Sequence, residues 1–314
     1  MKIVVTGGAG FIASHIVDAY LEMGHEVHII DNFSTGRNQN VNSRATVHRL
    51  DIAEPAAAAF IREIKPTILN HHAAQMDVRR SVDDPLFDAR VNILGFLNLL
   101  ESGRDAGVKK VIFASSGGAV YGDKEPIPAA EDHVTEPLSP YGVSKKTGEL
   151  YLAYYHAAFG LPYIALRYAN VYGPRQSSHG EAGVVAIFIG RFLSGKSPVI
   201  NGDGRQTRDY VYVGDVMRAN VAALESDYVG PVNIGTGNET DVVTLCQFLR
   251  EGLKTNIEPI HGAAKVGEQR RSAVATSLAK RVFNWKPQMS LPSGLAETIA
   301  YYQKQASDEP RPHP

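Results

Sequence analysis

The chain has 314 residues, of which 44% are hydrophobic and 21% charged, a composition that fits one large buried core and a smaller lobe. The formal net charge of -1 gives no electrostatic footprint for nucleic acid or for an anionic membrane surface. The single cysteine excludes an intrachain disulfide, and Cys246 lies in an apolar-periodic stretch that predicts a core thiol. No signal pattern and no apolar run of ~18 residues occur, so we expect a cytoplasmic protein.

The N-terminal stretch predicts a strand, a glycine turn and a helix. Apolar residues 3–5 run into the turn 6–13, after which apolar residues recur at helical spacing. Gly7 and Gly10 permit a tight turn and let backbone N–H groups approach a pyrophosphate, which the helix N-terminus also attracts. This arrangement predicts a dinucleotide site.

A second expected strand, 26–30, ends at Asp31, ~20 residues beyond the glycine turn, where a dinucleotide-binding fold places an acid on the adenine ribose. A carboxylate accepts hydrogen bonds from the ribose diol and repels a 2′-phosphate, so Asp31 predicts NAD rather than NADP. Arg37 is the competing signal, because a guanidinium pairs well with that phosphate.

Strands and helices then alternate along the chain. We expect strands at 46–50, 67–70, 109–114 and 163–166 and helices at 56–64 and 85–106. The alternation predicts an α/β fold with a doubly wound parallel sheet of Rossmann type, covered on both faces. Ligands bind at the carboxyl ends of such strands, where Gly7, Asp31, Asp51, His71 and Ser116 all fall.

The alternation loosens in the second half of the chain. We expect residues 1–179 to form the dinucleotide-binding domain and 180–306 mainly a smaller C-terminal substrate-binding lobe, with a strand near 231–235 returning to the main sheet. Residues 307–314, which include three prolines, are expected to form a flexible tail.

The stretch Tyr141-Gly142-Val143-Ser144-Lys145 places a phenol and an ammonium four residues apart on one helix face. The ammonium favours the charged phenolate and so lowers the pKa of the phenol, which makes the pair a candidate acid/base. The spacing alone also occurs by chance in many helices, so the neighbouring motifs must decide.

Taken together, the motifs resemble those of the extended short-chain dehydrogenase/reductases, and among them the nucleotide-sugar epimerases of UDP-glucose 4-epimerase type. The resemblance covers nearly the whole chain, at residues 6–13, 31–37, 71–75, 91–95, 115–122, 141–145, 167–175 and 208–215. It implies an enzyme that uses NAD, a UDP-sugar or other nucleotide-sugar as substrate, and a homodimer.

The resemblance implies roles for three catalytic residues. Tyr141 takes the proton of the sugar 4-hydroxyl while hydride passes to NAD, and Lys145 holds the nicotinamide ribose and lowers the tyrosine pKa. The 4-keto sugar then takes the hydride back on its other face. Ser116 hydrogen-bonds the reacting oxygen. The commoner family pattern places that hydroxyl at the position of Gly117, so Ser115 is the alternative to Ser116.

The stretch Gly117-Gly118-Ala119 separates related reactions. Sugar 4,6-dehydratases and the related decarboxylases carry acids there, and this chain carries none, which leaves epimerisation. Asp31 opposes an NADPH-consuming reductase. The alternatives are another NAD-dependent nucleotide-sugar enzyme, such as a C2 epimerase or a reductase, and a non-catalytic NAD-binding regulatory protein.

The resemblance also implies the binding residues. For the cofactor they are Gly7, Gly10, Phe11, Ile12, Asp31, Asn32, Ser34, Thr35, Gly36, Asp51, Ile52, His71, Ala73, Ala74, Gln75, Asn92, Ser115, Tyr141, Lys145 and Tyr168. For the substrate they are Asp77, Ser116, Gly117, Tyr141, Asn170, Val184, Val185, Asn201, Arg208, Lys265, Glu268 and Ser272.

Some of these assignments carry specific expectations. Asn170 and Arg208 are expected at the substrate diphosphate. Lys265 and Glu268 match an Arg-x-Gly-acid motif with lysine in place of arginine, which Arg271 would compensate. Ser272 stands where a bulky tyrosine restricts relatives to glucose and galactose, so room for a 2-acetamido group is expected.

Two further expectations concern the loop after the fourth strand. Asp77 would crowd or hydrogen-bond the sugar. No metal is expected at His71 and His72, because adjacent strand residues face opposite ways and no third ligand stands at metal spacing.

Overall fold

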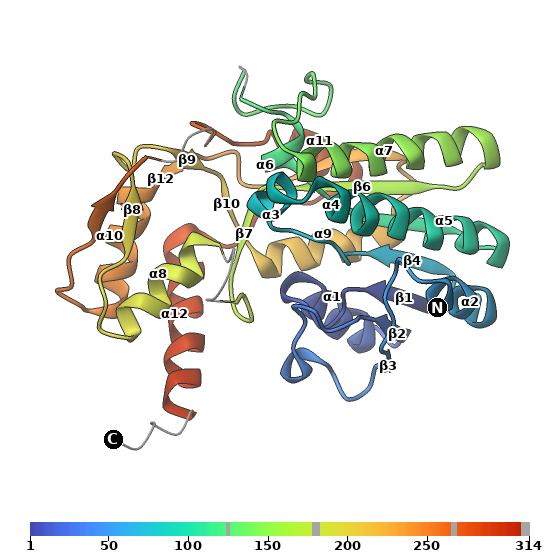
Figure 1. Ribbon diagram of the computed structural model, residues 1–314, viewed down its shortest axis with the longest axis horizontal. Helices are drawn as coiled ribbons and strands as arrows, with labels where there is room; N and C mark the ends of the chain where they lie inside the picture. The colour runs from blue at the N-terminus through green and yellow to red at the C-terminus, as the bar shows by residue number, and fades with distance from the viewer. Residues whose placement is uncertain (124–125, 178–182, 265–268, 309–314) are drawn as a thin grey trace.

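The computed structural model describes residues 1–123, 126–177, 183–264 and 269–308, and shows a large α/β lobe beside a smaller, mostly helical one (Figure 1). Within these ranges no helix is both long and apolar enough to cross a membrane. The two lobes have separate buried cores, so each is held together by its own apolar contacts.

The large lobe is built on one seven-stranded sheet in the order β11-β6-β5-β4-β1-β2-β3. Its strands are β1 (Lys2–Thr6), β2 (Glu26–Ile30), β3 (Thr46–His48), β4 (Ile68–His71), β5 (Lys110–Ser116), β6 (Tyr163–Tyr168) and β11 (Gly230–Ile234). Every pairing is parallel. The predicted doubly wound sheet is therefore confirmed, and its strand order reverses between β1 and β4, where such sheets bind ligands.

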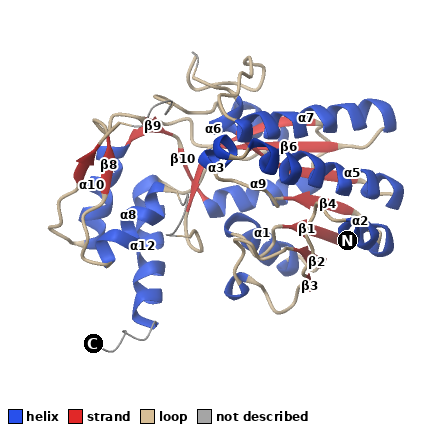
Figure 2. Cartoon of the chain, viewed as in Figure 1, coloured by secondary structure: helices blue, strands red, loops and turns tan. Residues whose placement is uncertain are grey.

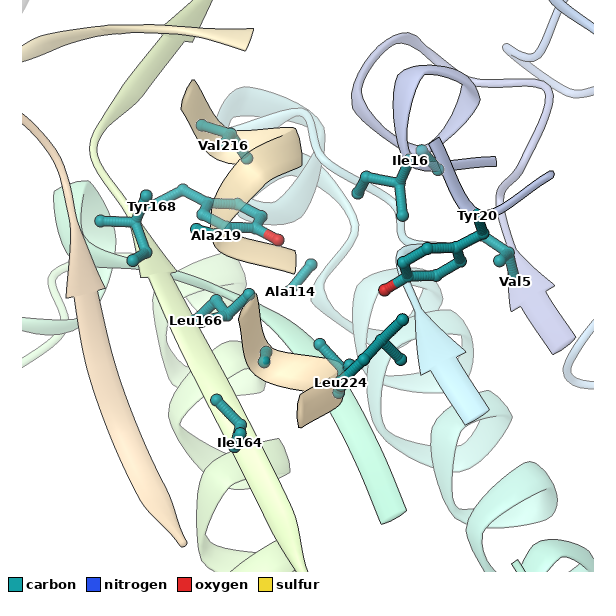
Figure 3. Close-up of a cluster of buried hydrophobic side chains, with 14 of the residues drawn as sticks. Val5, Ile16, Tyr20, Ala114, Ile164, Leu166, Tyr168, Val216, Ala219 and Leu224 are labelled. Carbon is teal, nitrogen blue, oxygen red and sulfur yellow. The ribbon is translucent and has the colours of Figure 1, made fainter. Parts of the chain in front are cut away.

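Helices cover both faces of this sheet. One face carries α1 (Phe11–Glu22), α9 (Val213–Glu225) and α11 (Ser277–Phe283); the other carries α2 (Pro55–Ile64), α5 (Gly95–Ala106) and α7 (Pro140–Phe159). Figure 3 shows the first face, where Ile16 and Tyr20 of α1 meet Val216 and Ala219 of α9 above the strands. The buried apolar faces of these helices explain their helical periodicity in the sequence.

The predicted single helix at 85–106 is interrupted. It consists of α4 (Pro85–Ala89), a π-helical turn (Arg90–Leu94) and α5, preceded by the short α3 (Val78–Asp83). The wider turn places the carboxamide of Asn92 beside Gln75, whose N–H donates to Asn92 at 2.8 Å and whose carbonyl accepts from it at 2.9 Å. Such π turns often occur at functional sites.

The smaller lobe packs helices over short strand pairs (Figure 2). Its helices are α8 (Val184–Leu193), α10 (Val242–Leu253) and α12 (Leu291–Asp308). The paired strands are β7 (Asn170–Tyr172) with β10 (Tyr210–Tyr212), β8 (Val199–Asn201) with β13 (Ile260–Gly262), and β9 (Thr207–Arg208) with β12 (Thr240–Asp241). Cys246 is a buried free thiol in this core.

The lobes are not contiguous in sequence. The strand expected near 231–235 is β11, at the edge of the main sheet, and α9 and α11 from the same half of the chain also pack on that sheet. Helix α12 continues through Asp308, one residue beyond the expected start of the tail at 307, and residues 309–314 lie outside the described part. The expected boundary at 179 also lies outside it.

Candidate active site

The carboxyl ends of β1 and β4 meet at the glycine turn. Gly7 has a φ of +69°, and a Cβ built on it would lie 2.8 Å from the backbone nitrogen of Ala73, so any side chain would collide with the loop after β4. Helix α1 begins after Gly10 without a side-chain cap. The N–H groups of its first turn, which includes Phe11 and Ile12, therefore remain to bind an anionic ligand, and the turn fits a dinucleotide pyrophosphate.

Thr6 is a residue that the sequence analysis missed. Its hydroxyl accepts hydrogen bonds from the backbone N–H groups of His72 and Ala73 at 3.1 and 3.0 Å, and lies 2.9 Å from Nδ1 of His71. Since the oxygen accepts twice, its own proton goes to His71. This threonine thus fixes the loop that continues through Ala74 to Gln75, and its place at a strand end was the available signal.

Besides the expected ribose contact, the Asp31 carboxylate holds two backbone segments together. Its carboxylate accepts from the N–H groups of Ala9 at 3.0 Å and Phe33 at 2.8 Å, which joins the glycine turn to the loop after β2. Gly36 lies against the same carboxylate, because a Cβ on it would be 2.9 Å from Oδ1. Arg37 donates to the Ser177 hydroxyl at 3.0 Å, so its guanidinium is held by the segment that follows β7.

The remaining cofactor positions of the sequence analysis follow β2 and β3. Asn32 donates to Asp51 at 3.0 Å and accepts from the N–H of Ser34, which orders the exposed loop that includes Thr35. Ile52 is buried against Gly95 at the start of α5. These residues line the same sheet edge as Gly7 and Asp31, although Ile52 lies in the core beneath that edge.

Tyr141, Lys145 and Ser116 come together where α7 crosses the end of β5. Ser139 caps the helix by accepting from the N–H of Gly142 at 3.1 Å. A Cβ on Gly142 would lie 2.6 Å from the carbonyl oxygen of Ala119, so the glycine is what lets the helix start approach the turn after β5. That approach brings the Tyr141 phenol close enough to the Ser116 hydroxyl for the hydroxyl to favour the phenolate.

Burial shifts the pKa values of Tyr141 and Lys145. Burial and the nearby Asp88 carboxylate raise the pKa of Tyr141 to about 12, although the hydrogen bond with Ser116 acts in the opposite direction. Lys145 donates to the carbonyl oxygen of Ala114 at 2.8 Å, and burial lowers the pKa of its ammonium to about 8. The pKa of the phenol is thus raised in the ligand-free protein, because burial and the Asp88 carboxylate outweigh the Ser116 hydroxyl, and the lowering expected from Lys145 stays a prediction.

The two candidate hydroxyls at the end of β5 face different partners. Ser115 is buried and donates to Glu149 at 2.6 Å, and the same carboxylate binds the buried Arg167 through two further bonds of 2.8 and 2.7 Å. Ser116, one residue on, faces the Tyr141 phenol. Alternation along the strand explains the division, since neighbouring side chains point to opposite faces.

Gly118, in the short helix α6 (Gly117–Val120), lies among three of the candidate substrate residues. A Cβ built on it would be 3.6 Å from Oδ1 of Asn170 and 4.0 Å from the hydroxyl oxygens of both Ser116 and Ser272. Residues from β5, β7 and the 272–275 segment thus gather around a position without a side chain. Gly117 is buried, and its Cβ would lie 2.7 Å from Val274.

The other substrate candidates are spread over the smaller lobe and the loop after β4. Val184 and Val185 start α8, Asn201 ends β8 and Arg208 ends β9. Asp77 caps α3 by accepting from Arg80 at 2.9 Å. Arg271 pairs with Glu239 at 2.6 Å. Lys265 and Glu268 lie outside the described residues.

The two histidines at the end of β4, His71 within the strand and His72 directly after it, have different partners. His71 is buried between aromatic rings, and burial, with the Lys145 charge, lowers its pKa well below the usual value. His72 contacts the hydroxyl of Tyr168 through Nε2 at 3.0 Å, and burial lowers its pKa to about 3. No cluster of three metal-ligating side chains occurs in the part of the chain that the structure describes.

Comparison with known proteins gives consistent matches. The model of the NAD dependent epimerase/dehydratase family matches residues 3–235. UDP-glucose 4-epimerase of Mycolicibacterium smegmatis is 42% identical, over 98% of this chain and 100% of its own length.

Two solved structures extend this comparison. The UDP-glucose 4-epimerase of Thermotoga maritima, solved with UDP-glucose, is 44% identical with a TM-score of 0.96, covering 98% of this chain and 100% of that one. The UDP-N-acetylglucosamine 4-epimerase of Methanobrevibacter ruminantium, in complex with UDP-N-acetylmuramic acid, is 36% identical with a TM-score of 0.92, covering 97% and 98%.

Proposed function

Because this chain belongs to the NAD dependent epimerase/dehydratase family, we propose that it interconverts nucleotide-sugars at C4, acting on UDP-glucose and UDP-galactose with NAD as cofactor. One observation carries the proposal: the Tyr141 phenol and the Ser116 hydroxyl lie close together beside a turn, 117–119, that bears no acid. A proton acceptor is thus available at the sugar oxygen, without a second acid for elimination.

The chain's own groups divide the work of the reaction. The Tyr141 oxygen accepts the proton of the 4-hydroxyl and later returns it, and Ser116 hydrogen-bonds the same sugar oxygen as its charge changes. Lys145, whose ammonium donates to the carbonyl oxygen of Ala114, would bind the nicotinamide ribose. When bound, NAD supplies the acceptor and then the donor of the C4 hydride. No net oxidation results, so the cofactor is regenerated in each cycle.

Elimination and decarboxylation are disfavoured by what lies near Tyr141. The turn Gly117-Gly118-Ala119 supplies no carboxylate to remove the C5 proton or assist loss of a group from C6. Asp88 is close enough to affect the charge of Tyr141, but it has no exposed surface and accepts three hydrogen bonds within the protein. It therefore does not reach a bound sugar, and the keto intermediate is left to be reduced.

N-acetylated substrates fit the same proposal. Ser272, Asn170 and Ser116 lie around Gly118, and none of them has a bulky side chain. The 36% identical relative named for UDP-N-acetylglucosamine supports this extension. We therefore include UDP-N-acetylglucosamine as a substrate, with Asn170 and Arg208 at the diphosphate, where a guanidinium makes strong charge-assisted bonds.

The test is a panel of nucleotide-sugars incubated with purified protein in D₂O, with products separated and weighed by mass spectrometry. A 4-epimerase converts UDP-glucose to UDP-galactose and back without taking deuterium into carbon, because the C4 hydrogen returns from the cofactor. A dehydratase breaks a carbon–hydrogen bond by proton transfer and incorporates deuterium, whereas an NAD-dependent C2 epimerase is recognised by a product whose configuration is changed at C2. No conversion of any UDP-sugar, or deuterated product, contradicts the proposal.

We also propose that the protein is a homodimer formed through α7. Val143, Leu150 and Tyr154 are 48%, 59% and 56% exposed and fall at one face of this helix, seven and four residues apart. A stripe of this kind suits a twofold contact with its own copy. Leu150→Glu should give a monomer by sedimentation, whereas Ile260→Glu on β13, also exposed, should not; a monomeric wild-type protein contradicts the proposal.

The proposed location is the cytoplasm. The only cysteine, Cys246, is a buried free thiol, as expected where the surroundings are reducing. A fusion to a fluorescent protein followed by cell fractionation tests this location.

A further inference from the structure

Asp88 is a buried carboxylate that the proposed reaction leaves without a role. It lies at the end of α4, directly before the π turn, and has no exposed surface. Ser144 donates to its Oδ2 at 2.6 Å, while Asn92 and Gln75 donate to its Oδ1 at 2.9 and 3.1 Å. A buried carboxylate is costly without such partners, so the three donors are what allow the charge to remain inside.

The three donors come from different parts of the candidate site. Gln75 belongs to the loop after β4, Asn92 to the π turn, and Ser144 to α7, where it precedes Lys145 and lies one turn from Tyr141. The carboxamide of Asn92 also holds both backbone groups of Gln75. One carboxylate therefore joins three segments: the loop after β4, the π turn, and helix α7, which carries Tyr141 and Lys145.

We propose that Asp88 is a positioning residue that fixes the helix of Tyr141 and Lys145 against the cofactor loop at Gln75. Asp88 does not touch the substrate and acts through Ser144. The kinetic consequence of this inference rests on the proposed epimerase function, whereas the coupling between α7 and the loop does not. Displacement of a catalytic group by about 1 Å commonly costs on the order of 10²-fold in rate.

The charge of Asp88 adds a second effect. It disfavours the phenolate of Tyr141, raising that pKa, and favours the ammonium of Lys145, opposing the effect of burial. Two other titratable groups near this pair are His71 and His72, and burial lowers the pKa of both, as does the charge of Lys145. Removing the carboxylate charge thus lowers both pKa values.

Two substitutions separate position from charge. Asp88→Asn keeps the size and an oxygen that accepts from Asn92 and Gln75, and its amide group can donate to Ser144, but it removes the charge. Asp88→Ala removes the junction. Ser144→Ala breaks only the link to α7, and Asp215→Asn, at a buried carboxylate that instead holds the 288–289 backbone, is the matched control.

The first readout is amide hydrogen exchange of the protein without substrate. We expect Asp88→Ala to accelerate exchange about tenfold or more at Gln75 and at the N-terminal turns of α7, with less than threefold change for Asp88→Asn or Asp215→Asn. Unchanged exchange in Asp88→Ala overturns the positioning role. Because no substrate is present, this outcome is independent of the proposed function.

The second readout is the pH profile of epimerisation. Asp88→Ala should lower kcat by about 10²-fold and Ser144→Ala by about tenfold, as expected for one lost hydrogen bond to a charged group, with KM altered less than threefold. Asp88→Asn should move both limbs of the kcat profile to lower pH by about one unit. An unshifted profile overturns the charge effect. If the wild type epimerises nothing while Asp88→Ala still alters exchange, the positioning role stands and the proposed function is lost.

Discussion

The ammonium of Lys145 donates a 2.8 Å hydrogen bond to the carbonyl oxygen of Ala114 and lies 5.7 Å from the ring centre of Tyr141. The lysine is thus anchored on β5, and it is not a direct partner of the phenol oxygen. The raised pKa of the phenol comes instead from burial and from the Asp88 carboxylate, neither of which follows from helix spacing. Because the two groups have different partners, we expect substitutions of Tyr141 and of Lys145 to have different effects.

Tyr141→Phe should keep the fold and NAD binding but lower epimerisation by about 10²–10⁴-fold, because it removes the proton acceptor and retains the ring. Calorimetric titration with NAD, circular dichroism and product analysis measure the three properties. Ser116→Ala should give a smaller loss, while Ser115→Ala should act mainly on stability through Glu149. A Tyr141→Phe enzyme with a tenth of wild-type turnover contradicts the assigned base.

Lys145→Met should change how stability depends on pH. The folded pKa of Lys145 is about 8 against an ordinary value of 10.5, so the unfolded state binds more protons between these values and wild-type stability rises there relative to the variant. The relative change is at most about 3 kcal/mol. Urea unfolding at pH 7.5 and pH 10 measures it, with Lys280→Met as an exposed control; parallel curves for wild type and Lys145→Met contradict the shift.

Protein purified without added nucleotide should release NAD rather than NADP on denaturation. Asp31→Asn is the informative variant, because it removes the charge that repels a 2′-phosphate while keeping an acceptor for Ala9 or Phe33. We expect the ratio of the affinity for NAD to the affinity for NADP to fall by about tenfold, equivalent to about 1.4 kcal/mol. Arg37→Gln should leave it unchanged, since Arg37 is held by Ser177. Recovery of mainly NADP from the wild type contradicts the role of Asp31.

Ser272→Tyr should suppress turnover of UDP-N-acetylglucosamine and spare UDP-glucose. Ser272 is buried beside the space over Gly118, and a tyrosine ring there meets a 2-acetamido group. One methylene-sized difference changes discrimination by about 10–200-fold, and an acetamido group is larger. Ser272→Ala is the control and should retain both activities. Competition assays with the two substrates measure the ratio; equal losses on both contradict the gatekeeper role.

The sequence by itself determined the fold class and the edge of the sheet at which the candidate cofactor residues gather. Apolar runs alternating with amphipathic stretches require buried parallel strands under helices, whatever the details of packing. The glycine turn, Asp31 and His71 each follow a strand, and the carboxyl ends of parallel strands necessarily meet at one edge. Local pattern was sufficient because each of these features depends on neighbours in the chain.

Only the tertiary structure decided the electrostatics and the supporting contacts. The effect of Asp88 on Tyr141, the anchoring of the cofactor loop by Thr6 and the different partners of Ser115 and Ser116 all join residues far apart in sequence. The π turn at Asn92 was equally hidden, because its sequence has ordinary helical spacing. A pKa depends on burial and on charges brought close by folding, and neither is encoded in the spacing of Tyr141 and Lys145 along one helix.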